Sequence, residues 1–369
     1  MKLLLLADPN SPHTIKWASS LCLFDIDIII FTLCDLHVDD YDKIDNIKII
    51  TSNMQIGTTE GAWNKLKYLR VLPVLKKTIK TFKPDIVHAH YASSYGLLGS
   101  LANFSPFILS IWGSDVYSFP KKSFLHQKIL QYNLIKADKI LSTSNVMKKE
   151  IGIYTNKNVE VTPFGIDLQK FKPTKVKSLF KGNDIVIGTV KTLDKKYGID
   201  YLIKAFKIVC NKQQNLPLKL LIVGGGPQDQ KTELEKLVAD LEIKNKVIFT
   251  DNVPFKMVST YHNMLSIFVA LSTEIESFGV AIIEASACQK PVVVSNVGGL
   301  PEVVDDKKTG FVVEAKNEYA AAEKIEKLVL DKKLRDKMGE EGRKRVKKLY
   351  NWDDNVRQML RIYQEVCIE

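Results

Sequence analysis

The segment Ile267-Phe-Val-Ala-Leu-Ser-Thr-Glu-Ile-Glu-Ser-Phe-Gly-Val-Ala-Ile-Ile-Glu284 joins two apolar runs through a polar loop. The first run, Ile267–Ala270, is short and continuous, as in a strand that is buried on both faces of a parallel sheet. Glu276 and Glu284 would point about 80° apart if one helix carried both. We therefore expect Glu276 in the loop after the strand and Glu284 two turns into the helix that follows.

The start of this helix is suited to an anion. The backbone N–H groups around Phe278, Gly279 and Val280 open the helix and can hold a phosphate. Glu284 lies in the apolar sequence Val-Ala-Ile-Ile-Glu-Ala-Ser-Ala, and a buried carboxylate requires a partner. A solvated surface helix with incidental glutamates explains this placement poorly, so we interpret the segment as functional.

Similar apolar runs alternate with helical patterns along nearly the whole chain. This alternation predicts two doubly wound, Rossmann-like α/β domains with parallel sheets, facing each other across a cleft. The expected strands are Leu3–Ala7, Ile26–Leu33, Ile47–Thr51, Ile86–Ala89, Phe107–Ile111, Lys139–Ser142 and Val159–Val161, then Ile185–Val190, Lys219–Val223, Val247–Thr250, Ile267–Ala270, Val292–Ser295 and Gly310–Val313.

The domain limits follow from breaks in this pattern. Two prolines and Gly165 interrupt it between Pro163 and Pro173, so we place an N-terminal domain at residues 1–168 and a second at 169–350. Residues 351–369 have apolar side chains at helical spacing and are expected to pack back on the first domain. Ligands of such sheets bind outside the carboxyl ends of the strands, so the loops there should carry the site.

Composition narrows the function. The 369 residues are 45% hydrophobic and 26% charged, which excludes disordered and collagen-like proteins. The net charge is +11, and residues 1–175 hold 22 Lys and Arg against 15 Asp and Glu, or +7. This excess predicts an anionic partner. The odd number of scattered cysteines, five, indicates reduced core thiols of a cytosolic protein, and no run of about 18 apolar residues predicts a membrane span.

Glycines and lysines follow several predicted strands. Lys191 and Lys196 come just after Ile185–Val190, where they can point into the expected cleft. Gly224-Gly225-Gly226-Pro227 joins a strand to a helix, with Pro227 suited to the first helical position. Gly298-Gly-Leu-Pro-Glu302 is either a plain turn or part of the site. The first strand leads into Asp8-Pro-Asn-Ser-Pro-His13 rather than G-x-G-x-x-G, which argues against a dehydrogenase.

The spacing of Glu276 and Glu284 resembles the E-x7-E signature of retaining nucleotide-sugar glycosyltransferases of family 4, which have the GT-B fold. The resemblance covers almost the whole chain. It extends to Gly188–Gly198, Val223–Pro227, Ala270–Ser272 and Gly298–Glu302.

The resemblance implies roles for individual residues. Glu276 would contact the donor sugar, Glu284 would hold the ribose hydroxyls, and Lys191 and Lys196 would neutralise the diphosphate without a metal. Lys191 stands where the family usually has arginine, and a lysine cannot form arginine's two-pronged contact. The other donor-binding residues expected are Ser272, Gly226, Phe278, Gly279 and Val280.

The N-terminal domain should bind the acceptor. His88 and His90 alternate in Asp85-Ile-Val-His-Ala-His-Tyr91 and should share one side of a strand, with His88 in the core and His90 nearer the site. Many family members carry a histidine where this chain has Trp112, and tryptophan cannot act as a base. Either Asp115, His90 or His13 takes the polar role, or the donor phosphate takes the acceptor proton.

Two stretches without acidic residues carry the basic charge of this domain. Such helices suit an anionic membrane surface, although most of their leucines should pack on their own sheet; nucleic acid is disfavoured because no binding motif is present. The first stretch, residues 61–84, contains Trp63, Lys65, Lys67, Arg70, Lys76, Lys77, Lys80 and Lys83; the second, residues 116–137, contains Phe119, Lys121, Lys122, Phe124, Lys128 and Lys136.

Together these features predict a retaining, metal-independent glycosyltransferase without cofactor. It would use a UDP-sugar, with a GDP-sugar as the alternative, and act on a glycan or lipid-linked acceptor of surface-polysaccharide synthesis. We expect it in the cytoplasm, peripheral at the inner face of the cell membrane. The rival interpretations are a sugar-nucleotide epimerase of the same fold and a catalytically silent sugar-nucleotide-binding subunit.

Overall fold

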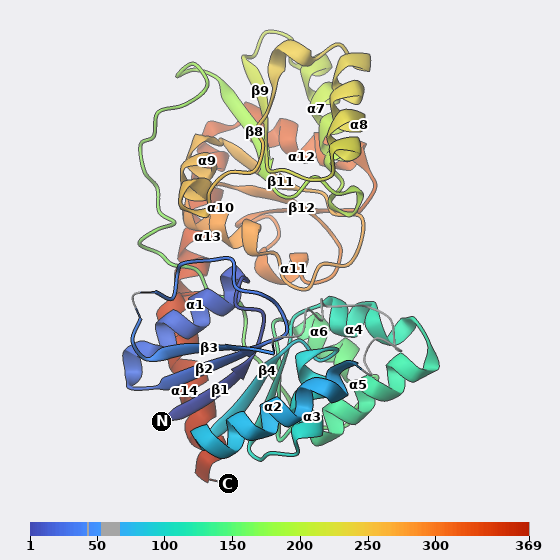
Figure 1. Ribbon diagram of the computed structural model, residues 1–369. Coiled ribbons are helices and arrows are strands. Elements are labelled where there is room, and N and C mark those ends of the chain that lie inside the picture. The colour runs from blue at the N-terminus through green and yellow to red at the C-terminus, as the bar shows by residue number, and fades with distance from the viewer. Residues whose placement is uncertain (43, 53–66, 369) are drawn as a thin grey trace. The chain divides into compact units, whose positions relative to one another are not determined.

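The computed structural model describes residues 1–42, 44–52 and 67–368. The chain divides into two compact units, each built around a parallel sheet (Figure 1). Unit 1 comprises Met1–Pro163 and Asp354–Glu369, and unit 2 comprises Phe164–Asp353. The limits proposed at 168 and 350 lie within a few residues of these.

The sheet of unit 1 has the strand order β3-β2-β1-β4-β5-β6-β7, and every pairing is parallel. The chain turns back at β1, because β2 lies on one side of it and β4 on the other. The strands are β1 (Lys2–Leu6), β2 (Asp27–Thr32), β3 (Ile47–Thr51), β4 (Ile86–His90), β5 (Phe107–Ile111), β6 (Lys139–Ser142) and β7 (Val159–Val161).

Helices cover both faces of this sheet. Right-handed crossovers place the helix of the β1–β2 connection on one face and those that lead toward β7 on the other. Leu4, Leu6, Val87 and Ala89 pack in one core with residues of α2, α3 and α5. The helices are α1 (Pro12–Leu21), α2 (Lys67–Phe82), α3 (Tyr95–Ala102), α4 (Ser114–Tyr117), α5 (Phe124–Lys136), α6 (Asn145–Ile151) and α14 (Trp352–Ile368), with short turns η1 (Cys22–Phe24) and η3 (Phe119–Lys121).

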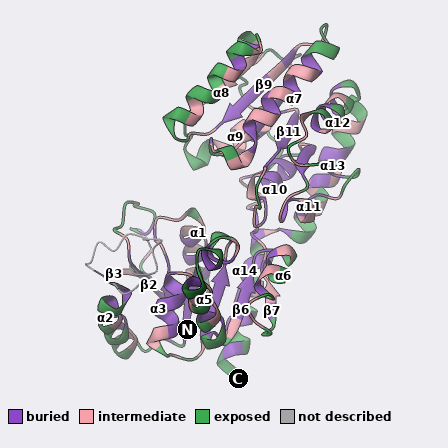
Figure 2. Cartoon of the chain, turned by 90° about the vertical axis from the view of Figure 1, so that its right-hand side faces the viewer, coloured by how far each residue is buried: buried purple, intermediate pink, exposed green. Residues whose placement is uncertain are grey.

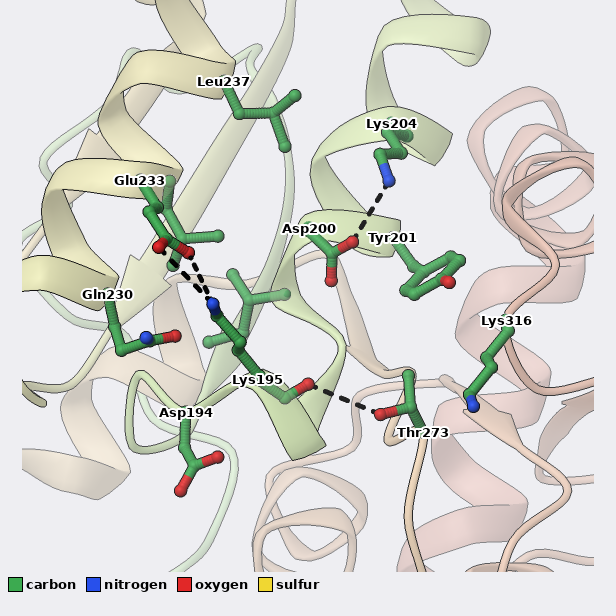
Figure 3. A pocket seen from close by; sticks show the side chains of 12 residues that line it. Asp194, Lys195, Asp200, Tyr201, Lys204, Gln230, Glu233, Leu237, Thr273 and Lys316 are labelled. Carbon is green, nitrogen blue, oxygen red and sulfur yellow. Dashed lines mark hydrogen bonds and ion pairs between the residues drawn. The ribbon is translucent and has the colours of Figure 1, made fainter.

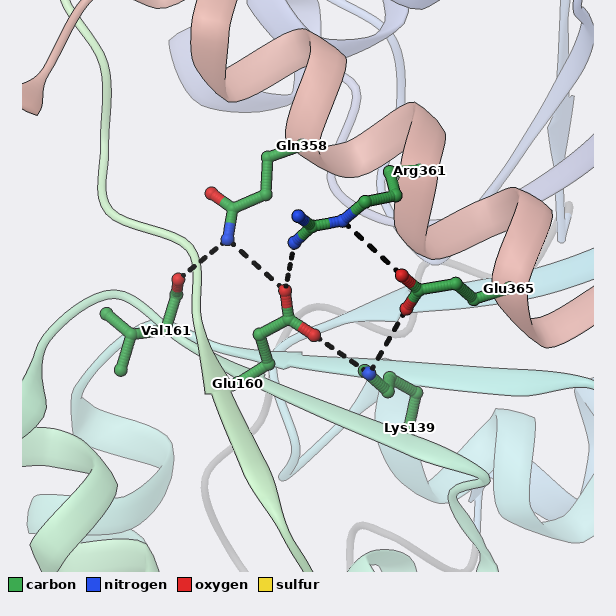
Figure 4. A network of polar contacts seen from close by, with 6 residues as sticks. All are labelled: Lys139, Glu160, Val161, Gln358, Arg361 and Glu365. Atoms are coloured by element: carbon green, nitrogen blue, oxygen red, sulfur yellow. Dashed lines mark hydrogen bonds and ion pairs between the residues drawn. The ribbon is translucent and has the colours of Figure 1, made fainter.

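Polar contacts tie α14 to the end of this sheet (Figure 4). Glu160 accepts hydrogen bonds from Gln358 at 3.3 Å and Arg361 at 3.1 Å and pairs with Lys139 at 2.8 Å. Burial of Glu160 opposes its ionisation, but Lys139 and its other partners outweigh burial and lower its pKa. Asn355 also donates to the Pro163 carbonyl at 2.6 Å, so α14 completes unit 1 although it comes last in the chain.

The sheet of unit 2 has the order β10-β9-β8-β11-β12-β13 and is also parallel, which confirms the predicted fold class. Its inner strands are buried and the edge strand β10 is half-buried, while helices such as α8 are exposed along one side (Figure 2). The elements are β8 (Ile185–Val190), β9 (Leu218–Val223), β10 (Val247–Phe249), β11 (Ile267–Ala270), β12 (Val292–Ser295), β13 (Gly310–Val313), α7 (Ile199–Lys212), α8 (Gln228–Asp240), α9 (Val258–Met264), α10 (Val280–Ala287), α11 (Leu300–Val303), α12 (Glu318–Leu330) and α13 (Lys332–Leu349), with η4 (Lys195–Tyr197), η5 (Lys244–Lys246) and η6 (Phe255–Met257).

Two further observations concern the chain as a whole. None of the described helices combines the length and the apolarity that a membrane span requires. All five cysteines are free, but only Cys210 and Cys288 are buried and Cys367 is exposed, so the prediction that all five lie in the core was wrong.

Candidate functional site

The candidate site of unit 2 lies where the direction of the sheet reverses. After β8 the chain adds β9 and β10 on one side of β8, and then returns to add β11, β12 and β13 on the other side. The loops after the neighbouring strands β8 and β11 therefore diverge and leave room for a ligand at their carboxyl ends. Lys191 follows β8 directly, and Ser272 and Glu276 follow β11.

The structure brings these three residues together. Lys191 Nζ lies 2.6 Å from Glu276 Oε2, and the Ser272 hydroxyl donates a hydrogen bond to the other carboxylate oxygen. The side chains of Lys191 and Glu276 are 19% and 13% exposed, so the ion pair is largely shielded but can still be reached by a ligand. A cation and an acceptor side by side can bind a phosphate and a sugar hydroxyl at neighbouring positions.

Lys196 lies apart from this pair. Its Nζ is 3.6 Å from Asp194 Oδ2, and its side chain is 44% exposed. The ring of Tyr197 links the two lysines, because Lys191 Nζ and Lys196 Nζ lie 4.2 Å and 5.0 Å from its centroid. Partial burial lowers the pKa of Lys196, but Tyr197 and Asp194 outweigh it, and the net pKa is raised. Sequence reasoning did not single out Tyr197.

Glycines let the loops approach closely. Gly198 has a φ of 59°, and an added Cβ would overlap the carbonyl oxygen of Leu271. Gly298 has a φ of 52°, and its Cβ would strike the carbonyl oxygen of Glu276. The neighbouring N–H of Gly299 donates to that same oxygen at 2.8 Å. The turn at Gly298 therefore holds the Glu276 loop in place.

The glycine run after β9 supports the site from the other side. An added Cβ on Gly226 would overlap the carbonyl oxygen of Leu193, so this run packs on the loop that carries Lys191. The helix after it begins at Gln228, with Pro227 as its N-cap. The prediction that Pro227 takes the first helical position was therefore wrong by one residue.

The second glutamate is buried in α10. Gly279, with a φ of 109°, is the N-cap of this helix, so Glu284 is its fifth residue. It lies just over one turn from the start, not two turns as predicted, because the helix begins only after the loop that contains Phe278. Phe278 is itself buried, with its ring 5.4 Å from that of Tyr350.

Glu284 has the partner that a buried carboxylate requires, and it is His262 of α9. His262 Nε2 lies 3.2 Å from Glu284 Oε2, with the two residues 0% and 6% exposed. Because an ionised carboxylate only accepts hydrogen bonds, Nε2 is the donor in this contact, while Nδ1 is buried with no partner among the described residues. No motif marks His262; only the need of Glu284 for a donor pointed to such a residue. Lys170 also lies in electrostatic reach of Glu284, and burial lowers its pKa.

Unit 1 has its own switch point, between β1 and β4. His13 lies at the start of α1, His90 ends β4, and Trp112 follows β5. The Trp112 ring centroid lies 4.3 Å from that of His90, 5.7 Å from that of His13 and 5.8 Å from that of Tyr91. Trp112 is thus the centre of an aromatic cluster at the edge of the sheet.

Three histidines of this unit, His13, His88 and His90, have pKa values that burial lowers. Burial, with Lys16 nearby, lowers the pKa of His13 to about 4. Burial lowers the pKa of His90 well below its usual value, and His90 Nδ1 has no hydrogen-bond partner within the part of the chain that the structure describes. His88 is the core residue that was expected, because its ring nitrogens lie 2.8 Å from Tyr363 and Ser110 hydroxyls.

Asp115 supports the loops around the cluster. It is 1% exposed and accepts hydrogen bonds from the backbone N–H groups of Ala92 and Gly113, each at 2.8 Å. Burial raises its pKa, and these hydrogen bonds oppose that rise. Its oxygens hold backbone rather than facing outward, a geometry that favours a positioning role for Asp115 over proton transfer.

A separate cavity of about 400 Å³ lies between α7 and α8 (Figure 3). Neither Glu276 nor Glu284 lines it. Four of its charged groups form two pairs, with Lys195 Nζ 3.1 Å from Glu233 and Lys204 Nζ 3.1 Å from Asp200, and Asp194 pairs with Lys196 outside the lining. We therefore do not assign this cavity to the donor.

The two basic stretches differ in how much of them is described. Residues 61–66, with Trp63 and Lys65, lie outside the described residues, and so does the side chain of Lys67. In the described part of α2, Lys76, Lys77 and Lys80 are exposed.

Within residues 1–42, 44–52 and 67–368, no three His, Cys, Asp or Glu side chains form a group that could hold a metal ion.

Two family models match this chain. The model described as Glycosyl transferase 4-like matches residues 2–144, and that described as Glycosyl transferases group 1 matches residues 170–345. The second match contains Lys191, Glu276 and Glu284, and the first contains the cluster around Trp112.

Individual proteins resemble the chain over most or part of its length. An uncharacterized glycosyltransferase of Methanocaldococcus jannaschii is 27% identical over 79% of this chain and 78% of its own. The capsular polysaccharide biosynthesis glycosyltransferase CapM of Staphylococcus aureus is 33% identical over 62% of this chain, but only 56% of CapM is covered. The Anabaena protein HepE, solved with UDP and glucose, has a TM-score of 0.79 at 17% identity, covering 99% of this chain and 100% of that one. This last likeness concerns the fold alone, which is GT-B.

Proposed function

The chain belongs to family 4 of the GT-B glycosyltransferases, and we propose that it moves a sugar from a nucleotide-diphosphate sugar to a hydroxyl acceptor with retention of configuration. The observation that carries the proposal is the ion pair of Lys191 and Glu276 at the carboxyl ends of β8 and β11, with Glu284 buried in α10, the helix that follows the Glu276 loop. These are residues that the family resemblance assigns to the donor. Unit 2 would therefore bind the donor and unit 1 the acceptor.

The donor side supplies charge stabilisation. As the bond between the anomeric carbon and the diphosphate oxygen breaks, negative charge grows on the phosphate and oxocarbenium character grows on the sugar. Lys191, Lys196 and the first N–H groups of α10 would stabilise the phosphate charge, so that no metal is required. Glu276 would hold the sugar hydroxyls, and Glu284 would hold the ribose hydroxyls.

The acceptor side orients a hydroxyl. Its oxygen forms the new bond to the anomeric carbon, and its proton must leave in the same step. Because burial lowers the pKa of His13 and His90, both are weak bases at neutral pH. We therefore favour transfer of the proton to the departing phosphate oxygen, with the cluster around Trp112 positioning the acceptor.

We propose a UDP-sugar as donor, with a GDP-sugar as the alternative. The support is the GT-B fold shared with HepE, which was solved with UDP and glucose. We propose a glycan or lipid-linked acceptor because CapM acts in capsular polysaccharide biosynthesis and because α2 and α5 carry exposed lysines. These helices would meet an anionic membrane at its cytoplasmic face, a reducing compartment that suits five free cysteines.

The proposal is tested with purified protein and a panel of nucleotides and nucleotide sugars. Binding of a donor should raise the melting temperature in proportion to affinity and concentration. Lys196→Ala and Glu284→Ala should each reduce donor turnover; if both leave it unchanged, the site assignment is wrong. Replacement of the lysines from Lys76 to Lys83 by glutamine should weaken binding to anionic vesicles.

Two rivals are separated by products. A sugar-nucleotide epimerase of the same fold would yield no new glycosidic bond and release no nucleoside diphosphate. A silent nucleotide-sugar-binding subunit is suggested by Trp112, which stands where many family members have histidine. Detectable donor hydrolysis or transfer by the purified chain would exclude this second rival.

A further inference from the structure

The outer side of α5 is apolar although nothing described covers it. Phe124 is 73% exposed, Leu125 50%, Ile135 65% and Tyr132 38%. At 100° per residue these four side chains, with Lys128 and Lys136, fall within about 120° of the helix circumference. We call these six residues the α5 outer face.

This face is additional to the one that holds α5 on the sheet. Leu130 and Leu134 are fully buried and belong to the core of unit 1. A helix that is apolar on both sides is expected to be covered on both sides. Exposed apolar side chains gathered in one place mark a surface that binds a partner or a membrane.

The charges that α5 itself carries are all positive, although the exposed Asp138, which follows the helix, lines one hollow with Ile135 and Lys136. Residues 116–137 contain no Asp or Glu. Lys128 Nζ lies 5.1 Å from the Phe124 ring centroid, and Lys136 Nζ donates to Asn103 Oδ1 at 3.0 Å. From outside the helix, Lys157 Nζ donates to the carbonyl oxygens of Ile135 and Ala137, both at 2.6 Å. Apolar side chains flanked by lysines can contact acyl chains while the lysines contact the anionic headgroups above them.

The start of α5 also lies at the same edge of the sheet as the aromatic cluster. A helix that follows a parallel strand starts at the carboxyl edge of the sheet and runs back toward its amino edge. Trp112 follows β5, and only α4 and η3 separate it from Phe124. Phe124 and Leu125 are thus at the edge where the acceptor is proposed to bind.

We propose that the α5 outer face inserts into an anionic lipid surface, with Phe124 and Leu125 reaching the acyl region. The inference deepens the membrane contact already proposed for α5 by naming the side chains that enter the lipid, and it rests on the proposed function for its purpose, which is to bring a lipid-linked acceptor to the edge that carries Trp112. A second copy of this chain fits less well, because a symmetric contact would bring like-charged lysines together.

The chain offers a matched control for the test. Leu23 and Phe24 of η1 form another adjacent Leu and Phe pair, 79% and 50% exposed. They follow α1, which right-handed crossover places on the opposite face of the sheet. Asp25 and Asp27 lie beside them in sequence, so an anionic surface should repel this region.

The experiment measures co-sedimentation of the full chain with vesicles of phosphatidylcholine, with and without phosphatidylglycerol. Phe124→Ser/Leu125→Ser should lower partition onto anionic vesicles about tenfold or more, and Leu23→Ser/Phe24→Ser should change it less than about twofold. Lys128→Gln/Lys136→Gln should lower binding only where phosphatidylglycerol is present. Unchanged melting temperatures of the serine variants will show that they are folded.

Three results would overturn the inference. They are wild-type partition by Phe124→Ser/Leu125→Ser, equal loss in the Leu23→Ser/Phe24→Ser control, and a wild-type dimer that the first variant alone makes monomeric. The melting-temperature shift with UDP is measured on the same samples. Vesicle binding without any UDP shift would support the α5 outer face as a lipid-binding surface and refute the donor proposal. A UDP shift without vesicle binding would support the donor proposal and refute the lipid-binding surface.

Discussion

Replacement of His262 by phenylalanine should destabilise unit 2 and weaken donor binding together. The change removes the N–H donor that lies 3.2 Å from Glu284 Oε2, at a site where His262 is 0% and Glu284 6% exposed. Phenylalanine keeps the aromatic contact with Phe268, whose ring centroid is 5.5 Å from that of His262. The principal loss is therefore the hydrogen bond to the carboxylate.

The size of the effect follows from this geometry. A buried charge that loses its partner costs about 3–5 kcal/mol, and a hydrogen bond to a charged group contributes about 1.5–3 kcal/mol. Since 3.2 Å is longer than the roughly 2.7–2.9 Å of the strongest such bonds, we expect about 2–3 kcal/mol. For a unit of this size, Phe164–Asp353, that lowers the melting temperature by about 4–12 °C.

Calorimetry of the full chain, with and without UDP, measures both effects. The transition that UDP shifts should fall in His262→Phe, and UDP affinity should fall with it, because Glu284 is no longer held in position. His262→Gln retains an N–H donor and should recover part of both losses. His88→Phe is the control, since His88 is buried in unit 1 between neutral hydroxyls and should leave UDP affinity unchanged.

A double-mutant cycle with Glu284→Gln decides the cause. If the histidine acts through the glutamate, the two substitutions should couple by more than about 1 kcal/mol, because the second adds little once the bond is lost. Additivity within about 0.5 kcal/mol would refute the reasoning and leave His262 as a packing residue.

Substitutions of three titratable residues, Lys191, His13 and Glu160, test the electrostatics of the two units. Lys191→Ala should weaken UDP binding more than tenfold by titration calorimetry. UDP lacks the sugar that Glu276 is proposed to hold, so adding Glu276→Gln should recover part of the loss by removing a carboxylate left without its cation; no recovery would count against the pairing. Because the pKa of His13 is lowered to about 4, the unfolded chain binds more protons than the folded chain between pH 6.5 and 4. The free energy of unfolding of unit 1 should therefore decrease as the pH is lowered through this range, by up to about 1.4 kcal/mol per pH unit from this group. Urea unfolding of His13→Phe across the same range should show a shallower dependence on pH. Because the pKa of Glu160 is lowered in the folded state, its ionised carboxylate stabilises the fold above the pKa of the unfolded state, and this stabilisation is lost as the pH falls through the pKa of the folded state. Glu160→Gln should therefore lower the melting temperature at neutral pH and have little effect at strongly acidic pH.

Most strands could be predicted from sequence because they are buried on both faces, whereas the edge strands β3, β7 and β10 are only partly buried. A continuous apolar run such as Phe107–Ile111 or Val292–Ser295 is then visible without any partner. All thirteen expected strands are present, with bounds that differ from the prediction by at most one residue at either end. The helix that carries Glu284 was placed less well, since its start depends on the left-handed conformation of Gly279, which composition does not report.

The pairings within the site could not be predicted because they depend on strand order. The pattern along the chain located Lys191, Glu276 and Glu284 in the right loops and helix. It did not reveal that β8 and β11 are neighbours although β9 and β10 come between them, which is what joins Lys191 to Glu276. His262 was missed for the same reason, because its contact with Glu284 joins α9, which precedes β11 along the chain, to α10, which follows it.

The two units place different chemistry at the same topological position. In unit 2, the reversal between β8 and β11 gathers Lys191 and Glu276, so a ligand there meets full charges. In unit 1, the reversal between β1 and β4 gathers aromatic rings around Trp112, with His13 and His90 kept neutral by burial. A diphosphate requires cations and would gain little from neutral imidazoles, whereas a sugar or lipid-linked hydroxyl suits aromatic faces and neutral nitrogens. This contrast in charge, rather than position in the chain, is the physical reason to assign the donor to unit 2 and the acceptor to unit 1.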